Sequence, residues 1–192
     1  MIYSLPNILT FSRIIVIPLF IGSFYLNQPW ASWVALALFS AASITDFFDG
    51  YLARARNLQS NLGKVFDPIA DKLLIATTIL MLVAFSQISG WSVLPALIIL
   101  LREILVSGLR EFLAEIQVSV PVTKLAKWKT AIQMVALGFL LSGAPGDELL
   151  SFLIDNLATT IGIIGLWAAA FLTLYTGWDY MSAGKIYLRE GD

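Results

Sequence analysis

Long apolar stretches constrain the fold of this 192-residue chain more than any other feature. A helix crosses a bilayer with about 20 mainly apolar residues, and 58% of the chain is hydrophobic while only 13% is charged. Turn-forming residues separate the stretches. The sequence therefore predicts an all-α integral membrane protein with six transmembrane helices, which together form one transmembrane domain over residues 1–192. The expected spans are Ile8–Leu26, Ala31–Tyr51, Pro68–Phe85, Trp91–Leu109, Trp128–Leu141 and Leu149–Tyr180.

The placement of the twelve Lys and Arg residues indicates the orientation of these spans. Basic residues collect in short cytoplasmic loops, and threading the six spans alternately puts all twelve on or towards one side. The opposite loops, at residues 27–30, 87–90 and 143–148, carry none. We therefore expect both termini to be cytoplasmic. The first twenty residues lack the charged n-region and the cleavage site of a signal peptide, so we expect no removable signal.

Two missing residue types limit the metal chemistry that is open to the chain. The sequence contains no cysteine and no histidine, so neither a thiolate nor an imidazole can bind a metal. Any metal must be held by oxygen, which favours Mg²⁺, Mn²⁺ or Ca²⁺. The net charge of -1 gives no basic excess of the kind that nucleic-acid binding needs.

Four aspartates lie where the second expected span ends and the third begins. Ionised side chains inside a span are costly and usually face a water-filled cavity or a partner. Asp46 and Asp49 are three residues apart, and Asp67 and Asp71 are four apart, so each pair shares one face of a helix. With a chain reversal over residues 52–66, both pairs can converge on one cavity near the cytoplasmic surface.

These four carboxylates would repel one another unless a positive charge neutralised them. Divalent cations remove the repulsion, and two of them could polarise a bound diphosphate. The alternative is that each aspartate only caps or ends a helix, as Asp67 before Pro68 suggests. Capping explains neither Asp46 inside its helix nor Asp71 one turn into the next. The quartet therefore predicts a metal site with Asp46, Asp49, Asp67 and Asp71 as ligands.

The quartet belongs to a longer pattern, D-x2-D-G-x2-A-R-x8-G-x3-D-x3-D, which the chain follows without departure at any fixed position. This pattern resembles the signature of the CDP-alcohol phosphatidyltransferase family. The six expected spans are also what that family implies. The matching positions are Asp46, Asp49, Gly50, Ala53, Arg54, Gly63, Asp67 and Asp71.

The resemblance implies an enzyme that transfers a phosphatidyl group from a CDP-activated lipid to an alcohol. It implies two divalent ions, Mg²⁺ or Mn²⁺, on the aspartates, with Asp71 also acting as the base, and it implies a homodimer in the bilayer. It further implies that the glycines and the arginine of the pattern line the CDP site, with weaker contributions from the N-terminal segment. The implied CDP-binding residues are Gly50, Ala53, Arg54, Gly63, Asn7 and Thr10.

Basic side chains near the cytoplasmic side bear on the identity of the alcohol. Arg102 and Glu103 lie inside the fourth expected span, and Lys127 and Lys129 precede or begin the fifth. Several fixed cations suit an acceptor that carries its own phosphate. Two alternatives stay open: lysines at a membrane edge are ordinary topology determinants, and Arg102 or Arg110 can pair structurally with a nearby glutamate.

Three further segments, Pro6–Arg13, Arg102–Glu111 and Lys127–Gln133, resemble the bacterial branch of the family that makes phosphatidylglycerophosphate. The implied substrates are CDP-diacylglycerol and sn-glycerol 3-phosphate. The implied location is the bacterial inner membrane, with the active site facing the cytoplasm. The implied residues for the acceptor phosphate are Arg110, Lys127 and Lys129, with Arg102 behind them.

Two other functions remain as alternatives. The first is the same chemistry with a different acceptor, either phosphatidylglycerol, as in a cardiolipin synthase, or an inositol phosphate. The second is a cation transporter. Its acidic sites should line a path through both halves of the membrane, but the opposite half carries only Asp147 and Glu148 in a loop and a single Asp155.

Overall fold

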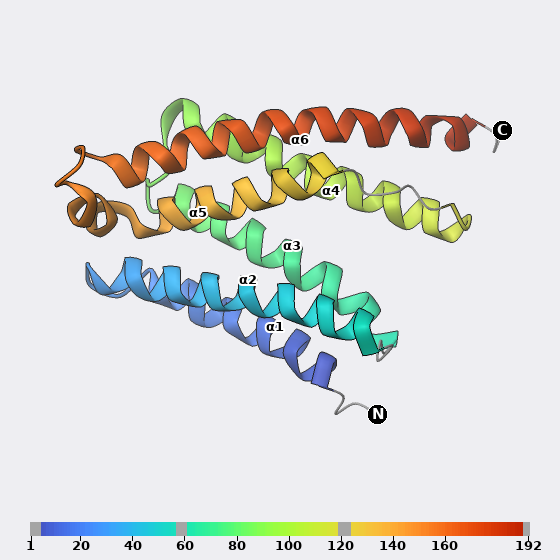
Figure 1. Ribbon diagram of the computed structural model, residues 1–192, viewed down its shortest axis with the longest axis horizontal. Helices are drawn as coiled ribbons and strands as arrows, with labels where there is room; N and C mark the ends of the chain where they lie inside the picture. Colours follow the sequence, from blue (N-terminus) through green and yellow to red (C-terminus); the bar gives the residue numbers. More distant parts are fainter. Residues whose placement is uncertain (1–4, 57–60, 119–123, 190–192) are drawn as a thin grey trace. The chain divides into compact units, whose positions relative to one another are not determined.

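The computed structural model of the chain describes residues 5–56, 61–118 and 124–189. Side chains are described at residues 12, 14–45, 69–70, 72–118 and 125–182. The described residues form α-helices and one short 3-10 helix, without a β-strand, which confirms the all-α prediction for this part of the chain (Figure 1). The helices are α1 Leu5–Ser23, α2 Trp30–Arg56, α3 Asn61–Ala84, η1 Gly90–Ser92, α4 Val93–Glu115, α5 Lys124–Leu150 and α6 Leu157–Arg189.

Two helical segments are long and apolar enough to cross a membrane by length and composition. They are Gly90–Glu115 and Leu157–Ser182, and each has a mean hydropathy of 1.9. Only 28% and 33% of these windows is buried, and large apolar side chains such as Ile104 and Phe171 are exposed. Exposed apolar surface of this kind is what lipid covers. Shorter apolar helices occupy Ile14–Ser23, Trp30–Thr45 and Lys72–Ala84. The chain is thus a membrane protein.

Several helix boundaries differ from the predicted spans. α2 continues to Arg56 and α3 begins at Asn61, so the reversal between them is shorter than predicted. Asp67 is therefore inside α3, and the alternative that it caps the start of this helix is wrong. The prediction failed because apolar stretches reveal only the part of a helix that suits lipid, and both helices extend beyond it into polar sequence.

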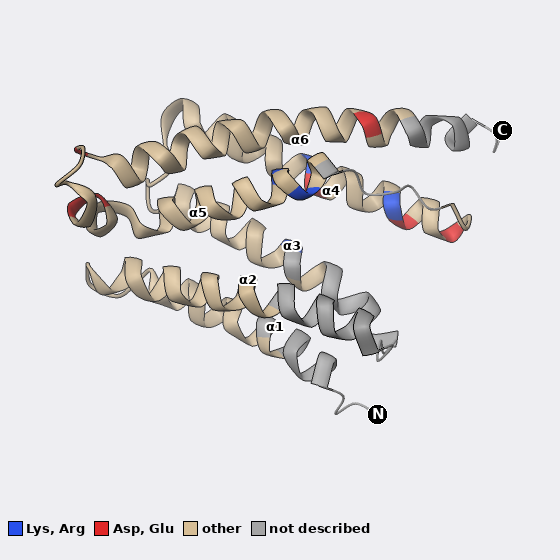
Figure 2. Ribbon diagram, in the orientation of Figure 1, with Lys and Arg blue, Asp and Glu red and all other residues tan. Residues whose placement is uncertain are grey.

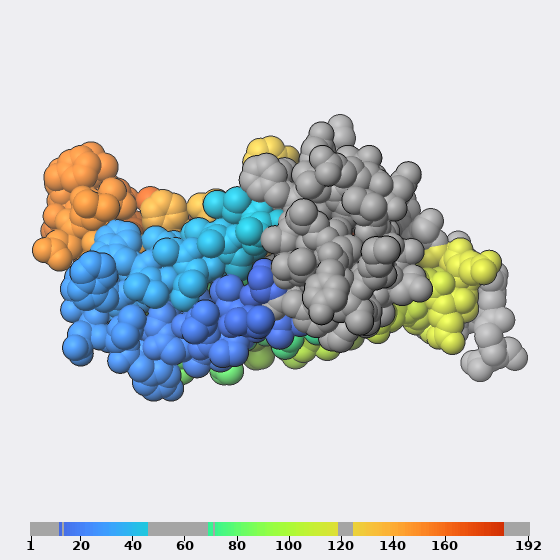
Figure 3. Space-filling view, turned by 90° about the horizontal axis from the view of Figure 1, so that it is seen from below, coloured from blue at the N-terminus to red at the C-terminus, as the bar shows by residue number. Residues whose placement is uncertain are grey.

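The chain divides into two compact units, and the first contains residues 1–87 and 138–159. In this unit α1 packs against α2 and α3, and Figure 3 shows the surfaces of α1 and α2 lying against each other. Aromatic rings join α1 to the end of α3. The ring of Phe85 lies 5.3 Å from that of Phe24 and 5.4 Å from that of Tyr25, measured between centroids.

The predicted loop at residues 143–148 begins with a break within α5. Gly143 has φ 51° and ψ -144°, which is not a helical conformation. Glycine adopts it easily because it has no side chain. A Cβ at this position would lie 3.1 Å from the amide nitrogen of Gln87, so the close approach also favours glycine. After the break, Asp147 accepts a hydrogen bond from the backbone N–H of Thr159 at 2.9 Å and one from its hydroxyl.

The predicted sixth span starts too early. The helix begins at Leu157 and not at Leu149, and it continues to Arg189. Residues 151–156 form turns, and Asn156 has a positive φ of 56°. Asparagine adopts this left-handed conformation more easily than most residues, so it marks the end of the turn before α6.

The second unit contains residues 88–137 and 160–192. It includes α4, the first half of α5 and most of α6, with Ile99, Leu137 and Leu166 fully buried. A Cβ at Gly165 of α6 would lie 2.9 Å from the Cβ of Ala136 on α5, so the two helices touch through small residues. Within this unit, α5 runs in the direction opposite to α4 and α6 (Figure 1).

Candidate functional site

The backbone places the predicted metal ligands on two helices. Asp46 and Asp49 belong to α2, and Asp67 and Asp71 belong to α3. Because both helices are continuous through these positions, spacings of three and four residues keep each pair on one face. The side chains of all four lie outside the described residues. Among the described side chains, no group of three or more Asp or Glu gathers that could hold a metal.

The predicted CDP-binding residues also lie where side chains are outside the described residues. Asn7 and Thr10 belong to α1. The others continue the aspartate pattern along α2 and α3. They are Gly50, Ala53 and Arg54 on α2 and Gly63 on α3.

Described charges of the second unit gather towards one end of its helices, as Figure 2 shows. The closest contact among them joins Lys129 of α5 to Glu103 of α4, where the ammonium lies against carboxylate oxygen Oε1. The lysine side chain is 5% exposed and that of the glutamate 21%. A charge this deeply buried requires a partner, so the contact explains how α5 can carry a lysine on its buried face.

Arg102 lies beside this pair and connects α4 to α6. Its guanidinium is 3.6 Å from Glu103 and donates a hydrogen bond of 3.1 Å to the hydroxyl of Thr176. Its carbon Cζ lies 5.9 Å from the ring centroid of Tyr180, within the range of a cation–π contact. A Cβ at Gly177 would come within 3.1 Å of the Arg102 stem. The alternative that an arginine pairs with Glu103 is thus confirmed for Arg102.

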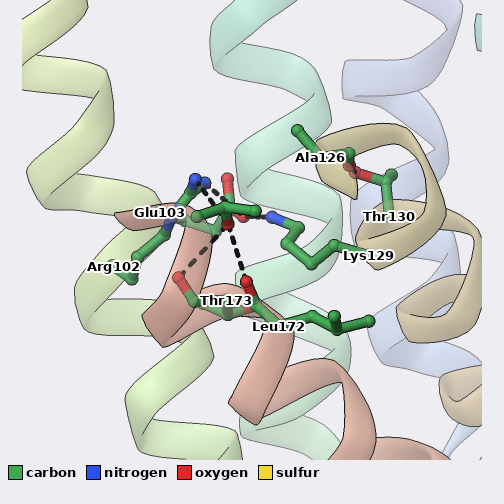
Figure 4. A network of polar contacts seen from close by, with 8 residues as sticks. Arg102, Glu103, Ala126, Lys129, Thr130, Leu172 and Thr173 are labelled. Atoms are coloured by element: carbon green, nitrogen blue, oxygen red, sulfur yellow. Dashed lines mark hydrogen bonds and ion pairs between the residues drawn. The ribbon is translucent and has the colours of Figure 1, made fainter. Parts of the chain in front are cut away.

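Figure 4 shows the resulting network, in which Arg102, Glu103 and Lys129 point toward one another from α4 and α5. α6 supplies the third side of the network through Thr176, whose hydroxyl also donates to the backbone oxygen of Leu172 at 2.8 Å. The network therefore ties three helices of one unit together through polar groups. Such groups are stabilising in an apolar setting only when each has a partner.

Two of the predicted phosphate-binding residues lie outside this network. Arg110 on α4 and Lys127 on α5 are exposed, and neither forms an ion pair or side-chain hydrogen bond with a described residue. The structure thus brings Lys129 and Arg102 together through Glu103 but leaves Arg110 and Lys127 accessible to solvent.

Sequence reasoning missed the contribution of α6. Thr176 and Tyr180 contact Arg102, although nothing in the sequence analysis assigned them a role. A signal was present, because Thr173, Thr176 and Tyr180 follow each other at intervals of three and four residues in a mainly apolar helix. This spacing puts the three polar side chains on one face.

Comparison with known proteins gives consistent similarities along the whole chain. A family model described as CDP-alcohol phosphatidyltransferase matches residues 3–181. Three similar relatives bear the name CDP-diacylglycerol–glycerol-3-phosphate 3-phosphatidyltransferase. The one from Rickettsia felis is 52% identical over 96% of this chain and 97% of its own length. Those from Cereibacter sphaeroides and Shigella flexneri serotype 5b are each 38% identical over 98% of this chain and 98% of their own.

Proposed function

The chain belongs to the CDP-alcohol phosphatidyltransferase family, and from this premise we propose that it transfers the phosphatidyl group of CDP-diacylglycerol to sn-glycerol 3-phosphate. The products are phosphatidylglycerophosphate and CMP, so the enzyme works in phospholipid biosynthesis. The observation that carries this function is the similarity to relatives of that name over 96% or more of both chains.

The reaction exchanges one phosphorus–oxygen bond for another. A hydroxyl oxygen of glycerol 3-phosphate bonds to the phosphorus that carries diacylglycerol, and the bond from that phosphorus to the bridging diphosphate oxygen breaks. CMP leaves with the bridging oxygen, and the hydroxyl proton goes to a base. We assign the base to Asp71, which is the last aspartate of the family pattern.

We assign two divalent ions, Mg²⁺ or Mn²⁺, to Asp46, Asp49, Asp67 and Asp71. Two observations support this: the chain offers no histidine or cysteine ligand, and each aspartate pair shares a face of α2 or α3. When bound, such ions neutralise the diphosphate and stabilise the leaving CMP. Gly50, Ala53, Arg54 and Gly63 continue the same two helices, with Asn7 and Thr10 on α1, and we assign these residues to the CDP moiety.

The exposure of the basic residues supports a ranking for the acceptor phosphate. Arg110 and Lys127 are exposed, so an anion can reach them without breaking an ion pair to a described residue. Lys129 contacts Glu103, yet an ammonium carries three donors, so this contact is compatible with a phosphate. Arg102 is engaged by Thr176 and Glu103, and we assign it mainly to the support of Lys129.

We place the whole chain in the bacterial inner membrane as one domain of six spans, with both termini and the active site on the cytoplasmic side. The one-sided distribution of all twelve basic residues supports this orientation. The segments Gly90–Glu115 and Leu157–Ser182 support the membrane location by their length and hydropathy. We also propose that the enzyme is a homodimer, as its family resemblance implies.

The direct test uses purified protein in detergent with CDP-diacylglycerol, glycerol 3-phosphate and Mg²⁺. We expect CMP release that depends on all three and stops when a chelator is added. Asp71→Asn should lose most of this turnover. Full turnover by this variant would show that Asp71 is not the base, whereas the absence of CMP release by the unaltered protein would contradict the function itself.

A further inference from the structure

A buried amide in the second unit has no hydrogen-bond partner among the described residues. The side chain of Gln133 on α5 is 1% exposed, and neither its nitrogen Nε2 nor its oxygen Oε1 forms a hydrogen bond with any group that the structure describes. An amide carries two donors and one acceptor oxygen, and burying them unpaired is unfavourable. Lipid cannot relieve this cost. The amide therefore calls for a polar group other than those that the structure describes.

The position of Gln133 indicates where that group lies. Gln133 follows Lys129 by four residues, which puts it on the same face of α5 and about 6 Å further along the helix axis. Both side chains belong to the buried face of the helix, together with Ala136 and Leu137. The unpaired amide is thus one helical turn beyond the ion pair of Lys129 and Glu103.

α6 carries a second unpaired group at a corresponding level. The hydroxyl of Thr173 is fully buried and also has no hydrogen-bond partner among the described residues. It precedes Thr176, the partner of Arg102, by three residues. Because α5 and α6 run in opposite directions (Figure 1), Gln133, which follows Lys129, and Thr173, which precedes Thr176, lie in the same sense along the helices.

The chemistry of the two groups limits what they can bind. An amide and a hydroxyl are both neutral, and each can donate and accept. Neither can neutralise a charge, and a buried charge without a counter-ion is strongly unfavourable. The matching ligand group is therefore a neutral hydroxyl, which itself donates one hydrogen bond and accepts others. It lies one helical turn from side chains that attract an anion.

We propose that Gln133 binds the hydroxyl on carbon 2 of glycerol 3-phosphate and makes the enzyme selective for acceptors that carry it. This inference rests on the proposed function. Glycerol 3-phosphate has two hydroxyls, of which the one on carbon 1 reacts and the one on carbon 2 stays. When its phosphate is held by the cations near the start of α5, the hydroxyl on carbon 2, which is next to the carbon that carries the phosphate, lies within reach of a side chain one helical turn further along the helix. The hydroxyl of Thr173 offers it a further partner.

The first test needs no variant. Propane-1,3-diol monophosphate keeps the phosphate and the primary hydroxyl of glycerol 3-phosphate but lacks the hydroxyl on carbon 2. The purified full-length enzyme should use it with a kcat/KM about tenfold to hundredfold lower, the effect of losing one or two buried hydrogen bonds. Equal use of the two acceptors would overturn the proposal.

The second test assigns the selectivity to Gln133. Gln133→Met keeps the size of the side chain and removes its polar atoms, so kcat/KM for glycerol 3-phosphate should fall while that for the diol phosphate stays unchanged. The ratio of the two should then approach one. The matched control is Gln87→Met, because the oxygen of Gln87 is also buried and unpaired but belongs to the other unit. This variant should keep the selectivity of the unaltered enzyme.

The outcomes separate the inference from the function on which it rests. If Gln133→Met lowers kcat/KM for both acceptors equally, the amide is structural and the proposal is wrong. In that case the ratio of kcat/KM for glycerol 3-phosphate to kcat/KM for the diol phosphate stays as it is in the unaltered enzyme. Because the comparison is a ratio within one protein sample, partial unfolding of the variant does not affect it. If the unaltered enzyme releases no CMP with glycerol 3-phosphate, the proposed function fails first.

Discussion

The buried ammonium of Lys129 on α5 forms an ion pair with the partly buried carboxylate of Glu103 on α4. The pair joins two helices of one unit, and Arg102 lies 3.6 Å from the same carboxylate oxygen. In an apolar setting, removing one charge from such a group weakens the compensation of the charges that remain. Lys129 therefore belongs both to this contact between helices and to the proposed acceptor site, and its effects on stability and on acceptor binding can be separated by experiment.

Glu103→Gln should destabilise the protein by about 3–5 kcal/mol, because it removes the carboxylate that Lys129 and Arg102 share. Lys129→Met should cost less, because Glu103 keeps Arg102 as a partner. The double variant removes both charges of the closest pair, so it should be more stable than Glu103→Gln while its KM for glycerol 3-phosphate stays high. Unfolding in detergent and CMP release measure the two effects. A double variant that is less stable than both single variants would show that Glu103 does not serve as the counter-ion of Lys129.

Arg110→Ala should impair acceptor binding without affecting the fold. Arg110 is exposed, and losing one charge-assisted contact to a phosphate corresponds to about 1.5–3 kcal/mol, or an increase of about tenfold to a hundredfold in KM. KM for CDP-diacylglycerol should not change. The neighbouring exposed Glu111 provides the control, since Glu111→Ala should leave both constants unaltered. An unchanged KM for glycerol 3-phosphate in Arg110→Ala would remove this residue from the site.

One glycine substitution tests the contact between α5 and α6, and a second, on α4, is its control. Gly165→Ala puts a methyl group 2.9 Å from the Cβ of Ala136, so the helices must move apart, at a cost of about 1–3 kcal/mol. Gly108 on α4 has no atom within 4 Å of the added Cβ, so Gly108→Ala should be neutral or stabilise the helix by about 0.5–1 kcal/mol. Melting temperatures in detergent measure both. Equal effects of the two changes would contradict the close contact.

The orientation of α4 can be tested because the chain has no cysteine of its own. Ser89 precedes this helix, Glu115 ends it, and both are exposed. In intact spheroplasts, Ser89→Cys should react with a membrane-impermeant maleimide, whereas Glu115→Cys should react only after the membrane is permeabilised. The reverse pattern would place the proposed active site on the outer side.

The sequence predicts some parts of this protein better than others, for physical reasons. Apolar length shows which segments suit lipid, so the positions of the helices could be predicted, but the polar extension of α3 back to Asn61 could not. The spacing of residues within one helix can also be predicted from the sequence, which is why Asp46 and Asp49 could be placed on one helix face. Contacts between helices depend on how each is rotated. The hydrogen bond from Arg102 to Thr176 joins residues 74 positions apart, and no local pattern indicates it.

The unpaired amide of Gln133 illustrates the same limit. The sequence shows a glutamine on an early turn of an apolar helix, but only the packed structure shows that its side chain is buried and without a partner. For the aspartate quartet the situation is reversed, since the sequence pattern carries the assignment and the side chains lie outside the described residues. The two sources thus inform different parts of the site.

The central claim concerns which lipid the enzyme makes. The most direct measurement supplies purified protein with CDP-diacylglycerol, Mg²⁺ and equal concentrations of glycerol 3-phosphate, phosphatidylglycerol and inositol phosphate, and identifies the lipid products by mass spectrometry. We predict phosphatidylglycerophosphate as the main product, formed in step with CMP and absent when a chelator is present. Cardiolipin or an inositol phospholipid as the main product, or phosphatidylglycerophosphate formed without divalent metal, would contradict this account.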